Sequence, residues 1–150
     1  MGGLRGFAWN CGGLRRSSAS TLSKVMFFEK SFKNDFDFFF FLETHHKDEN
    51  EIPNELMRYS DTHHIIHSET DENDSHTGII GLIRREYTVS NITQIMQGRI
   101  LGLNISDSSK RINFRISAVY LPTNQNFTLD NMRDIGPDLR LYNCWGLQFY

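Results

Sequence analysis

Cysteine, long apolar runs and secretion signals are all scarce or missing in this 150-residue sequence. Its two cysteines, Cys11 and Cys144, lie near opposite ends, which excludes a disulfide framework and favours a reducing compartment, nuclear or cytoplasmic. No apolar run approaches the roughly 20 residues of a membrane-spanning helix, and the N-terminus lacks the apolar region of a signal peptide. We therefore expect a soluble, intracellular protein with no membrane partner.

A surplus of positive charge is missing as well, because 16 Lys and Arg residues face 18 Asp and Glu residues, a net charge of -2. The chain thus has no global basic footprint for nucleic acid, and a polyanionic substrate would have to be held by a metal ion and local arginines. The 39% hydrophobic and 23% charged content is ordinary for one globular domain, and it leaves the oligomeric state open.

The first 42 residues predict a strand, a helix and a second strand. The stretch from Leu4 to Asn10 is short and apolar and ends at the turn-forming pair Gly12-Gly13. Ser18 to Ser20 offer N-cap oxygens, and apolar residues then follow at roughly helical spacing, which predicts a helix from about Ser20 to Lys33. The apolar positions are Leu22, Val25, Met26 and Phe32.

The run from Phe36 to Leu42 contains five Phe residues and predicts a strand that is buried on both faces. A helix between two such strands is the βαβ pattern, which brings both C-terminal strand ends to one edge of the sheet. Asn10 and Glu43 are therefore expected to be neighbours. A carboxylate beside a carboxamide is a common way to hold Mg²⁺, which prefers oxygen ligands and binds through one or two carboxylates plus substrate phosphates.

The rest of the chain predicts loops and antiparallel strands. Polar loops are expected from Thr44 to Glu55 and from Glu69 to His76, and Gly98 and Asp107-Ser108-Ser109 supply hairpin turns. Beyond Asn126 the pattern degrades, and residues 127–150 are expected to be an irregular tail. The predicted strands are His63–His67, Gly78–Ile83, Tyr87–Ile95, Arg99–Ile105 and Arg111–Tyr120.

Five short motifs occur in a fixed order along the chain. They are Trp9-Asn10-Cys11-Gly12-Gly13-Leu14, Phe41-Leu42-Glu43-Thr44-His45, Gly78-Ile79-Ile80-Gly81, Gly98-Arg99 and Val119-Tyr120-Leu121-Pro122-Thr123-Asn124. This series resembles the endonuclease/exonuclease/phosphatase superfamily. The closest likeness is to the endonuclease domain of non-LTR retrotransposons, which is similar to apurinic-apyrimidinic endonucleases. The resemblance implies a mixed α/β fold, the DNase I-like four-layer α/β/β/α sandwich, with residues 1–126 as its N-terminal part.

The resemblance also implies a Mg²⁺-dependent DNA endonuclease and a role for each matching residue. Glu43 matches the metal-ligating Glu, and Asn10 matches the Asn beside it in the catalytic network. Tyr120 matches the Tyr whose hydroxyl contacts the scissile phosphate, and Asn124 approximates the Asn that follows it. Arg99 matches the Arg of the family's Gly-Arg pair, in either a structural or a substrate-directed role.

The sequence departs from the family pattern at three matching positions. Gly12 stands where related repair enzymes carry an acidic residue, and Leu42 stands where many relatives have Gln. Thr123 lengthens the spacing from Tyr120 to Asn124 by one residue. One metal-site carboxylate is therefore absent, and the role of Asn124 is weakened.

Two further family motifs do not occur in these 150 residues. Gly-Asp-x-Asn supplies the Asp that handles the nucleophilic water, and Ser-Asp-His supplies the His that stabilises the phosphate; the sequence has no Gly-Asp pair and no His beyond His76. We expect a truncated or frame-shifted copy with little or no turnover. We also expect it to supply roughly the first sheet alone, so that the inner face of Phe36–Leu42 and Gly78–Ile83 has no partner and favours aggregation.

Several alternatives stay open. The chain could be another phosphoesterase of the superfamily, acting on lipid or inositol phosphates, or a non-catalytic module that binds nucleic acid or phosphate. The six His residues lie between His45 and His76 and could hold zinc, although surface loops are the favoured interpretation. Two basic pairs, Arg84-Arg85 and Lys110-Arg111, could touch DNA backbone, although exposed strand-end charges are the simpler interpretation.

Overall fold

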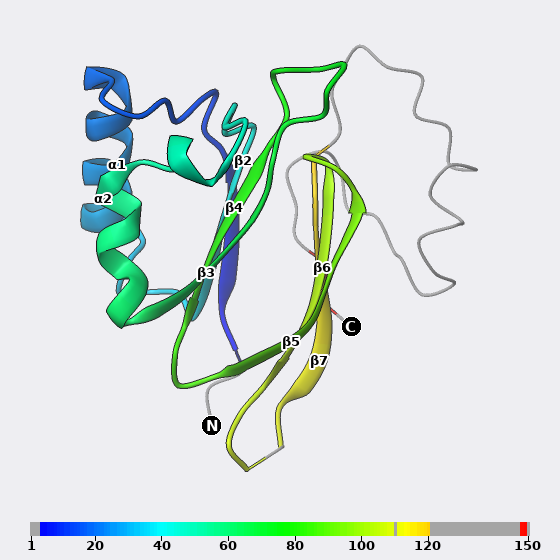
Figure 1. Cartoon of the computed structure of the whole chain (residues 1–150). Coiled ribbons are helices and arrows are strands. Elements are labelled where there is room, and N and C mark those ends of the chain that lie inside the picture. Colours follow the sequence, from blue (N-terminus) through cyan, green and yellow to red (C-terminus); the bar gives the residue numbers. More distant parts are fainter. Residues whose placement is uncertain (1–3, 110, 121–147, 150) are drawn as a thin grey trace.

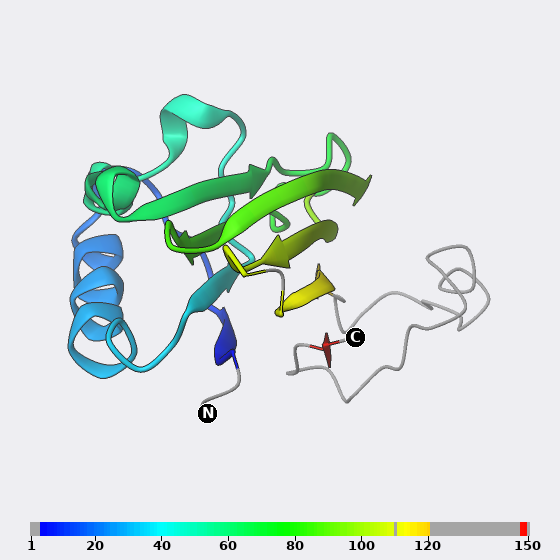
Figure 2. The ribbon, with the colours of Figure 1, turned by 90° about the horizontal axis from the view of Figure 1, so that it is seen from below.

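A computed structural model describes residues 4–109, 111–120 and 148–149, and these residues form a mixed α+β fold. Figure 1 shows the layers: α1 and α2 cover the outer face of one sheet, and a second sheet packs on its inner face. The first sheet has the order β1-β2-β4-β3 and the second the order β5-β6-β7-β8. The view from below in Figure 2 shows the same helices on one side of the strands.

The elements follow the predicted order closely. The helices are α1 (Ala19–Ser31) and the short α2 (Asn54–Met57), which lies between 3₁₀ turns at Glu49–Glu51 and Arg58–Asp61. The strands are β1 (Gly6–Asn10), β2 (Phe38–Leu42), β3 (His63–Ser68), β4 (Ile79–Arg84), β5 (Thr88–Met96), β6 (Ile100–Ser106), β7 (Asn113–Val119) and β8 (Gln148–Phe149). Among the described residues, no helix is both long and apolar enough to cross a membrane.

The predicted βαβ unit is confirmed. Strands β1 and β2 pair in parallel with Asn10 opposite Leu42, and α1 connects them. On the other side of β2, strand β4 runs antiparallel, with Leu42 opposite Ile79. Strand β4 therefore belongs to the first sheet, while β5 and β6 form the hairpin of the second sheet, joined at Gly98 as predicted.

The Phe-rich strand β2 is fully buried because its two faces enter different cores. Phe39 and Phe41 point toward the helices, where the ring of Phe28 lies 4.6 Å from that of Phe39. Phe38 and Phe40 point toward the second sheet. Alternate side chains of a strand face opposite sides, so an unbroken apolar run fits a central strand with a layer on each face, as predicted.

The expectation of an uncovered inner face is wrong. That face packs against apolar residues of β6 and β7, so the two sheets share one core. The prediction failed because it assigned these strands no partner across the sandwich, although their alternating apolar residues are what a packed inner face requires. The covering residues are Leu101, Leu103, Ile105, Ile116 and Ala118.

Three local predictions also need correction. The buried face of α1 consists of Thr21, Val25 and Phe28, while Leu22 and Met26 are 46% and 58% exposed. Phe28 decides this orientation, because its ring joins the aromatic cluster on the sheet. Ser18 is the N-cap by its extended backbone but forms no side-chain cap bond.

The predicted loop from Thr44 to Glu55 contains short helical turns that place Ile52 and Leu56 in the core.

Candidate metal-binding site at the edge of the first sheet

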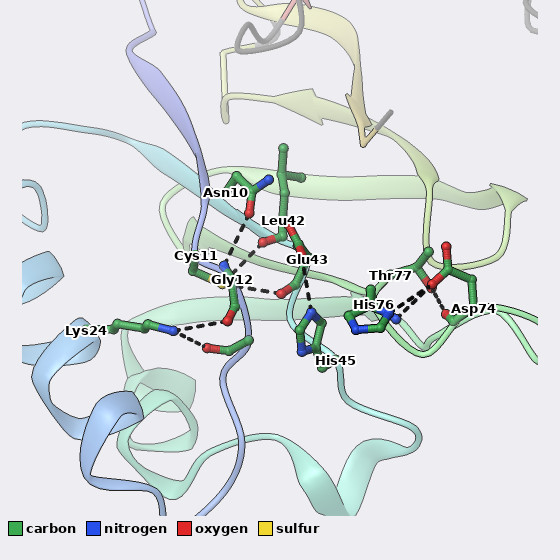
Figure 3. A network of polar contacts seen from close by, with 11 residues as sticks. Asn10, Cys11, Gly12, Lys24, Leu42, Glu43, His45, Asp74, His76 and Thr77 are labelled. Carbon is green, nitrogen blue, oxygen red and sulfur yellow. Dashed lines mark hydrogen bonds and ion pairs between the residues drawn. The ribbon is translucent and has the colours of Figure 1, made fainter. Parts of the chain in front are cut away.

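The candidate site forms where β1 and β2 end side by side. Beyond the paired strand ends, the backbone N–H of Cys11 donates to the Leu42 carbonyl at 3.0 Å, and the N–H of Gly13 donates to the Glu43 carbonyl at 2.7 Å. Figure 3 shows Asn10 and Glu43 together at this edge. The ammonium of Lys24, in α1, donates to the carbonyl of Gly13 at 2.8 Å and so connects the loop after β1 to this helix.

The Glu43 carboxylate is the metal-ligand candidate at this edge, and 22% of its side chain is exposed. The nearest imidazole is that of His45, whose Nε2 lies 3.4 Å from Glu43 Oε1. Both residues have left-handed backbones, with φ of 60° and 62°. Non-glycine residues rarely adopt this conformation, which occurs preferentially at functional sites.

Gly78 allows its own segment of the chain to pack closely against this strained turn. The N–H of Thr44 donates to the Gly78 carbonyl at 3.2 Å, and a Cβ atom at Gly78 would collide with the Thr44 hydroxyl. The φ of 113° at Gly78 also suits glycine alone. The turn that carries Glu43 therefore lies between the Gly12-Gly13 loop on one side and Gly78 on the other.

Tyr120 reaches the same edge from the second sheet, directly after β7. Burial raises the pKa of the Tyr120 hydroxyl, and the negative charges of Glu43 and Asp74 and a hydrogen bond to Glu43 raise it further. The hydroxyl is therefore protonated at neutral pH and can donate a hydrogen bond to a carboxylate or phosphate oxygen.

Asn10 lies at the sheet edge, and its side chain also hydrogen-bonds to the loop that follows β1. Its Oδ1 accepts a hydrogen bond from the Gly12 backbone N–H at 3.2 Å, which shapes the turn after β1. This contact uses the amide oxygen, so the amide NH₂ is the group able to donate toward a phosphate. Asn124, the remaining predicted catalytic residue, lies outside the described residues.

Arg99 is buried and holds the loop of residues 69–76 in place. Its guanidinium pairs with Asp74 at 3.0 Å and with Asp71 at 3.9 Å, and its side chain is only 5% exposed. Among the residues that the structure describes, Nη1 of Arg99 is the one buried side-chain nitrogen or oxygen without a hydrogen-bond partner. These contacts give Arg99 a structural role beneath the site.

The edge offers one carboxylate to a cation, with an amide and a phenol nearby. Within residues 4–109, 111–120 and 148–149, no group of three or more His, Cys, Asp or Glu residues could hold a metal ion. A site with one carboxylate suits Mg²⁺, which keeps several waters and takes further ligands from substrate phosphates. Glu43 would supply the protein ligand of such an ion.

The interpretation of the histidines as surface residues is wrong for His46 and His63, which are 1% and 9% exposed. The Nδ1 atom of His46 lies 2.6 Å from the Thr44 hydroxyl, and its Nε2 lies 3.2 Å from Nδ1 of His67. Burial and, to a smaller extent, the neighbouring His67 lower the pKa of His46 to about 4, against the opposing effect of Asp48. His46 is therefore a neutral core residue under the Glu43 turn.

A basic pocket that the sequence analysis missed lies beside this edge. Its volume is about 360 Å³, and its lining includes Arg15, Arg16 and Lys47 as well as His45. Arg16 joins two walls of the pocket by donating to the Asn50 carbonyl and the Asn54 side chain, each at 2.9 Å. The signal was the pair Arg15-Arg16, which follows Gly12-Gly13 after one residue.

Comparison of the sequence with models of known protein families finds no match, and comparison with curated proteins finds none either. The motifs and the geometry of the edge are therefore the basis for assigning a function.

Proposed function

We propose that this chain holds Mg²⁺ at Glu43 and binds a DNA phosphodiester there, as the metal-binding part of a DNase I-like endonuclease site. The observation that carries the proposal is the convergence of Asn10, Glu43 and Tyr120 at one sheet edge. These residues come from three segments far apart in the sequence, and each matches a residue of the same family motif set. The layering of helices, sheet and sheet supports the proposed DNase I-like sandwich.

Each residue has a separate task in this proposal. The Glu43 carboxylate ligates the ion, and waters and phosphate oxygens complete its coordination. The bound ion neutralises phosphate charge and polarises the phosphorus–oxygen bonds. The Tyr120 hydroxyl and the Asn10 amide donate hydrogen bonds to phosphate oxygens and fix their orientation. Such a substrate agrees with action in the nucleus or cytoplasm.

Turnover by these 150 residues is low in this proposal. Neither Gly-Asp-x-Asn nor Ser-Asp-His occurs in the sequence, so the family's groups for the attacking water and for the phosphate charge are not supplied. General acid–base groups contribute about 10² to 10⁴ each to the rate. Binding without efficient cleavage is thus the expected behaviour.

The basic pocket favours one alternative, a non-catalytic module that binds nucleic acid by its phosphates. Within the described part of the chain, Arg15, Arg16 and Lys47 form no ion pair, so their charge is free to attract a polyanion next to Glu43. Binding of this kind weakens steeply with salt and does not require Mg²⁺.

The experiment is a Mg²⁺ titration followed by amide NMR, in the wild type and in Glu43→Gln. Mg²⁺ should shift the signals of Asn10, Glu43 and Tyr120 in the wild type and leave them unchanged in the variant. Glu49→Gln removes an exposed carboxylate from the neighbouring loop and serves as the matched control, with shifts like those of the wild type. Nicking of supercoiled DNA is measured in parallel, beside hydrolysis of lipid and inositol phosphates.

Three results would change the conclusion. Equal Mg²⁺ shifts in the wild type and Glu43→Gln would remove Glu43 as the ligand. If the wild type nicks DNA rapidly with Mg²⁺ and Glu43→Gln does not, Glu43 remains the proposed metal ligand, but the expectation of low turnover is wrong. Hydrolysis of inositol or lipid phosphates, with DNA untouched, would favour the other branch of the superfamily.

A further inference from the structure

A second basic pocket lies at the opposite end of the first sheet from Glu43. Its volume is about 580 Å³, and its walls come from three segments: the chain after α1, the turn between α2 and β3, and the end of β4. Figure 1 shows α2 leading into β3 at this end of the sheet. Ile83, next to the pocket residue Arg84, pairs with Phe38 at the start of β2, whereas Glu43 follows the end of β2. The length of β2, about 17 Å, therefore separates the two sites.

The lining of this pocket is strongly cationic. Four basic side chains line it, and the acidic residue among the lining residues is Glu86. Arg84 has a partner in Asp37, at 3.8 Å. The other three basic residues form no ion pair in the part of the chain that the structure describes; these are Lys33, Arg58 and Arg85.

Three of the four cations are held in position by contacts with the neighbouring segments. Arg85 donates from Nε to the Ser60 carbonyl at 2.7 Å, and Arg84 donates from Nη2 to the Asn34 carbonyl at 3.2 Å. The Lys33 ammonium lies 5.1 Å from the centre of the Tyr59 ring. Because these contacts join all three walls, the positive charges are gathered before any ligand arrives, which reduces the entropy lost on binding.

We propose that this second basic pocket binds a phosphate-bearing anion independently of the Glu43 edge. Guanidinium groups match the geometry of phosphate oxygens and bind them with pairs of charge-assisted hydrogen bonds, and an ammonium adds a point charge. The volume suits a ligand the size of a nucleotide, and the open face also accepts one phosphate of a DNA backbone. The proposal does not rest on metal binding at Glu43.

The buried imidazole of His63 reports on this pocket. It lines the pocket and packs edge-on against Tyr59 with the ring centres 5.6 Å apart. Burial lowers the pKa of His63, and the positive charges of Arg84, Lys33 and His64 lower it further. An anion bound among these cations offsets their field, so its binding raises the pKa of His63.

The test uses the whole 150-residue chain without divalent cations, in a Glu43→Gln background that removes the proposed metal ligand. Inorganic phosphate and a short DNA duplex are titrated separately, and the His63 ring is followed by NMR. The test variant is Lys33→Gln with Arg58→Gln, and the matched control is Lys30→Gln, an exposed cation of α1 outside the pocket. Thermal melting of each variant verifies that it is folded.

Phosphate is expected to raise the pKa of His63 in a saturable way, and the double variant should bind it at least about tenfold more weakly. For DNA, the slope of log affinity against log salt should fall by about one for each cation removed. Response to both probes identifies a free phosphate group as sufficient, and response to DNA alone identifies the backbone as the ligand. The proposal is overturned if neither probe shifts His63, or if Lys30→Gln weakens binding as much as the double variant.

Discussion

The backbone N–H of Tyr120 donates a hydrogen bond of 2.7 Å to the carbonyl of Arg99. The bond lies one residue beyond the ladder of β6 and β7, in which Ile100 faces Val119. This hydrogen bond links Arg99, whose buried guanidinium pairs with Asp74, to Tyr120, whose phenol interacts with Glu43. Two residues that the motifs placed in the site are thus coupled through the main chain.

Arg99→Gln is expected to lower the free energy of unfolding by about 3 kcal/mol, because it leaves the partly buried carboxylates of Asp71 and Asp74 without their cation. Urea denaturation at neutral pH measures this loss. Arg111→Gln, at an exposed position, should change stability by less than about 0.5 kcal/mol. Equal stability of Arg99→Gln and the wild type would indicate that Arg99 serves the substrate instead of the fold.

The packing of the two sheets against each other gives a second prediction. Leu103 of β6 is fully buried against the inner face of the first sheet, so Leu103→Ala should lower the free energy of unfolding by about 2–5 kcal/mol. Ile92→Ala removes a similar side chain from β5, where it is 54% exposed, and should cost less than about 0.5 kcal/mol. If both variants unfold at the same urea concentration, the second sheet does not share a core with the first.

The βαβ unit could be predicted because its signals are local: an apolar run, a helical period, and a second apolar run that ends at Glu43. Parallel pairing then brought Asn10 and Glu43 together without further information. The packing of β6 on β2 could not be predicted in the same way. It depends on which faces meet across the sandwich, and nothing within Ile100–Ser106 specifies the opposite sheet.

The same difference between local signals and long-range packing applies to the candidate site. The motifs predict Glu43, Asn10 and Tyr120 as site residues, but the burial of His46 was missed because adjacent histidines in a polar segment resemble a solvated loop. The burial of His46 agrees with the helical turns of residues 49–61, which fold the following segment onto the sheet. The second basic pocket was equally hidden, since its cations come from three separate segments.

His46 should make the protein sensitive to acid. Its pKa is about 4 in the folded protein and about 6.5 when unfolded, so the unfolded state binds more protons between these values. Stability should therefore fall as the pH falls from about 6.5 toward 4, with a contribution from His46 of about 3 kcal/mol. Urea denaturation across this range measures it, and His46→Asn should flatten the dependence. Titration of the folded His46 ring near pH 6.5 by NMR would contradict the expectation.

Cys11 should be chemically inert while the protein is folded. Burial raises the pKa of its thiol to about 12, and Sγ donates to the Leu42 carbonyl at 3.2 Å, so almost no thiolate forms near neutral pH. Mass spectrometry of the peptide that contains Cys11, after treatment with iodoacetamide, should show no alkylation of the native protein and full alkylation in urea. Equal labelling in both states would mean that the strand end is open to solvent.

Gly12 offers a strong test of the proposed metal site, because a carboxylate can be introduced there, where repair enzymes of the superfamily that the chain resembles carry an acidic residue. A Cβ atom at Gly12 meets nothing within 4 Å, and Asp tolerates the left-handed φ of 62° better than most residues, at about 1 kcal/mol. Gly12→Asp should therefore fold and place a second negative charge beside Glu43, which strengthens Mg²⁺ binding about tenfold in calorimetric titration.

The matched control for this gain is Gly12→Asn, which has nearly the same shape and backbone preference but no charge. If the second carboxylate acts with Glu43 on one ion, the gain should largely disappear when Glu43→Gln is added, because the two ligands then no longer cooperate. A gain that persists in the Glu43→Gln background would locate the ion elsewhere in the loop after β1. Equal Mg²⁺ affinity of Gly12→Asp and Gly12→Asn would mean that a carboxylate at position 12 does not reach the ion, which contradicts the prediction.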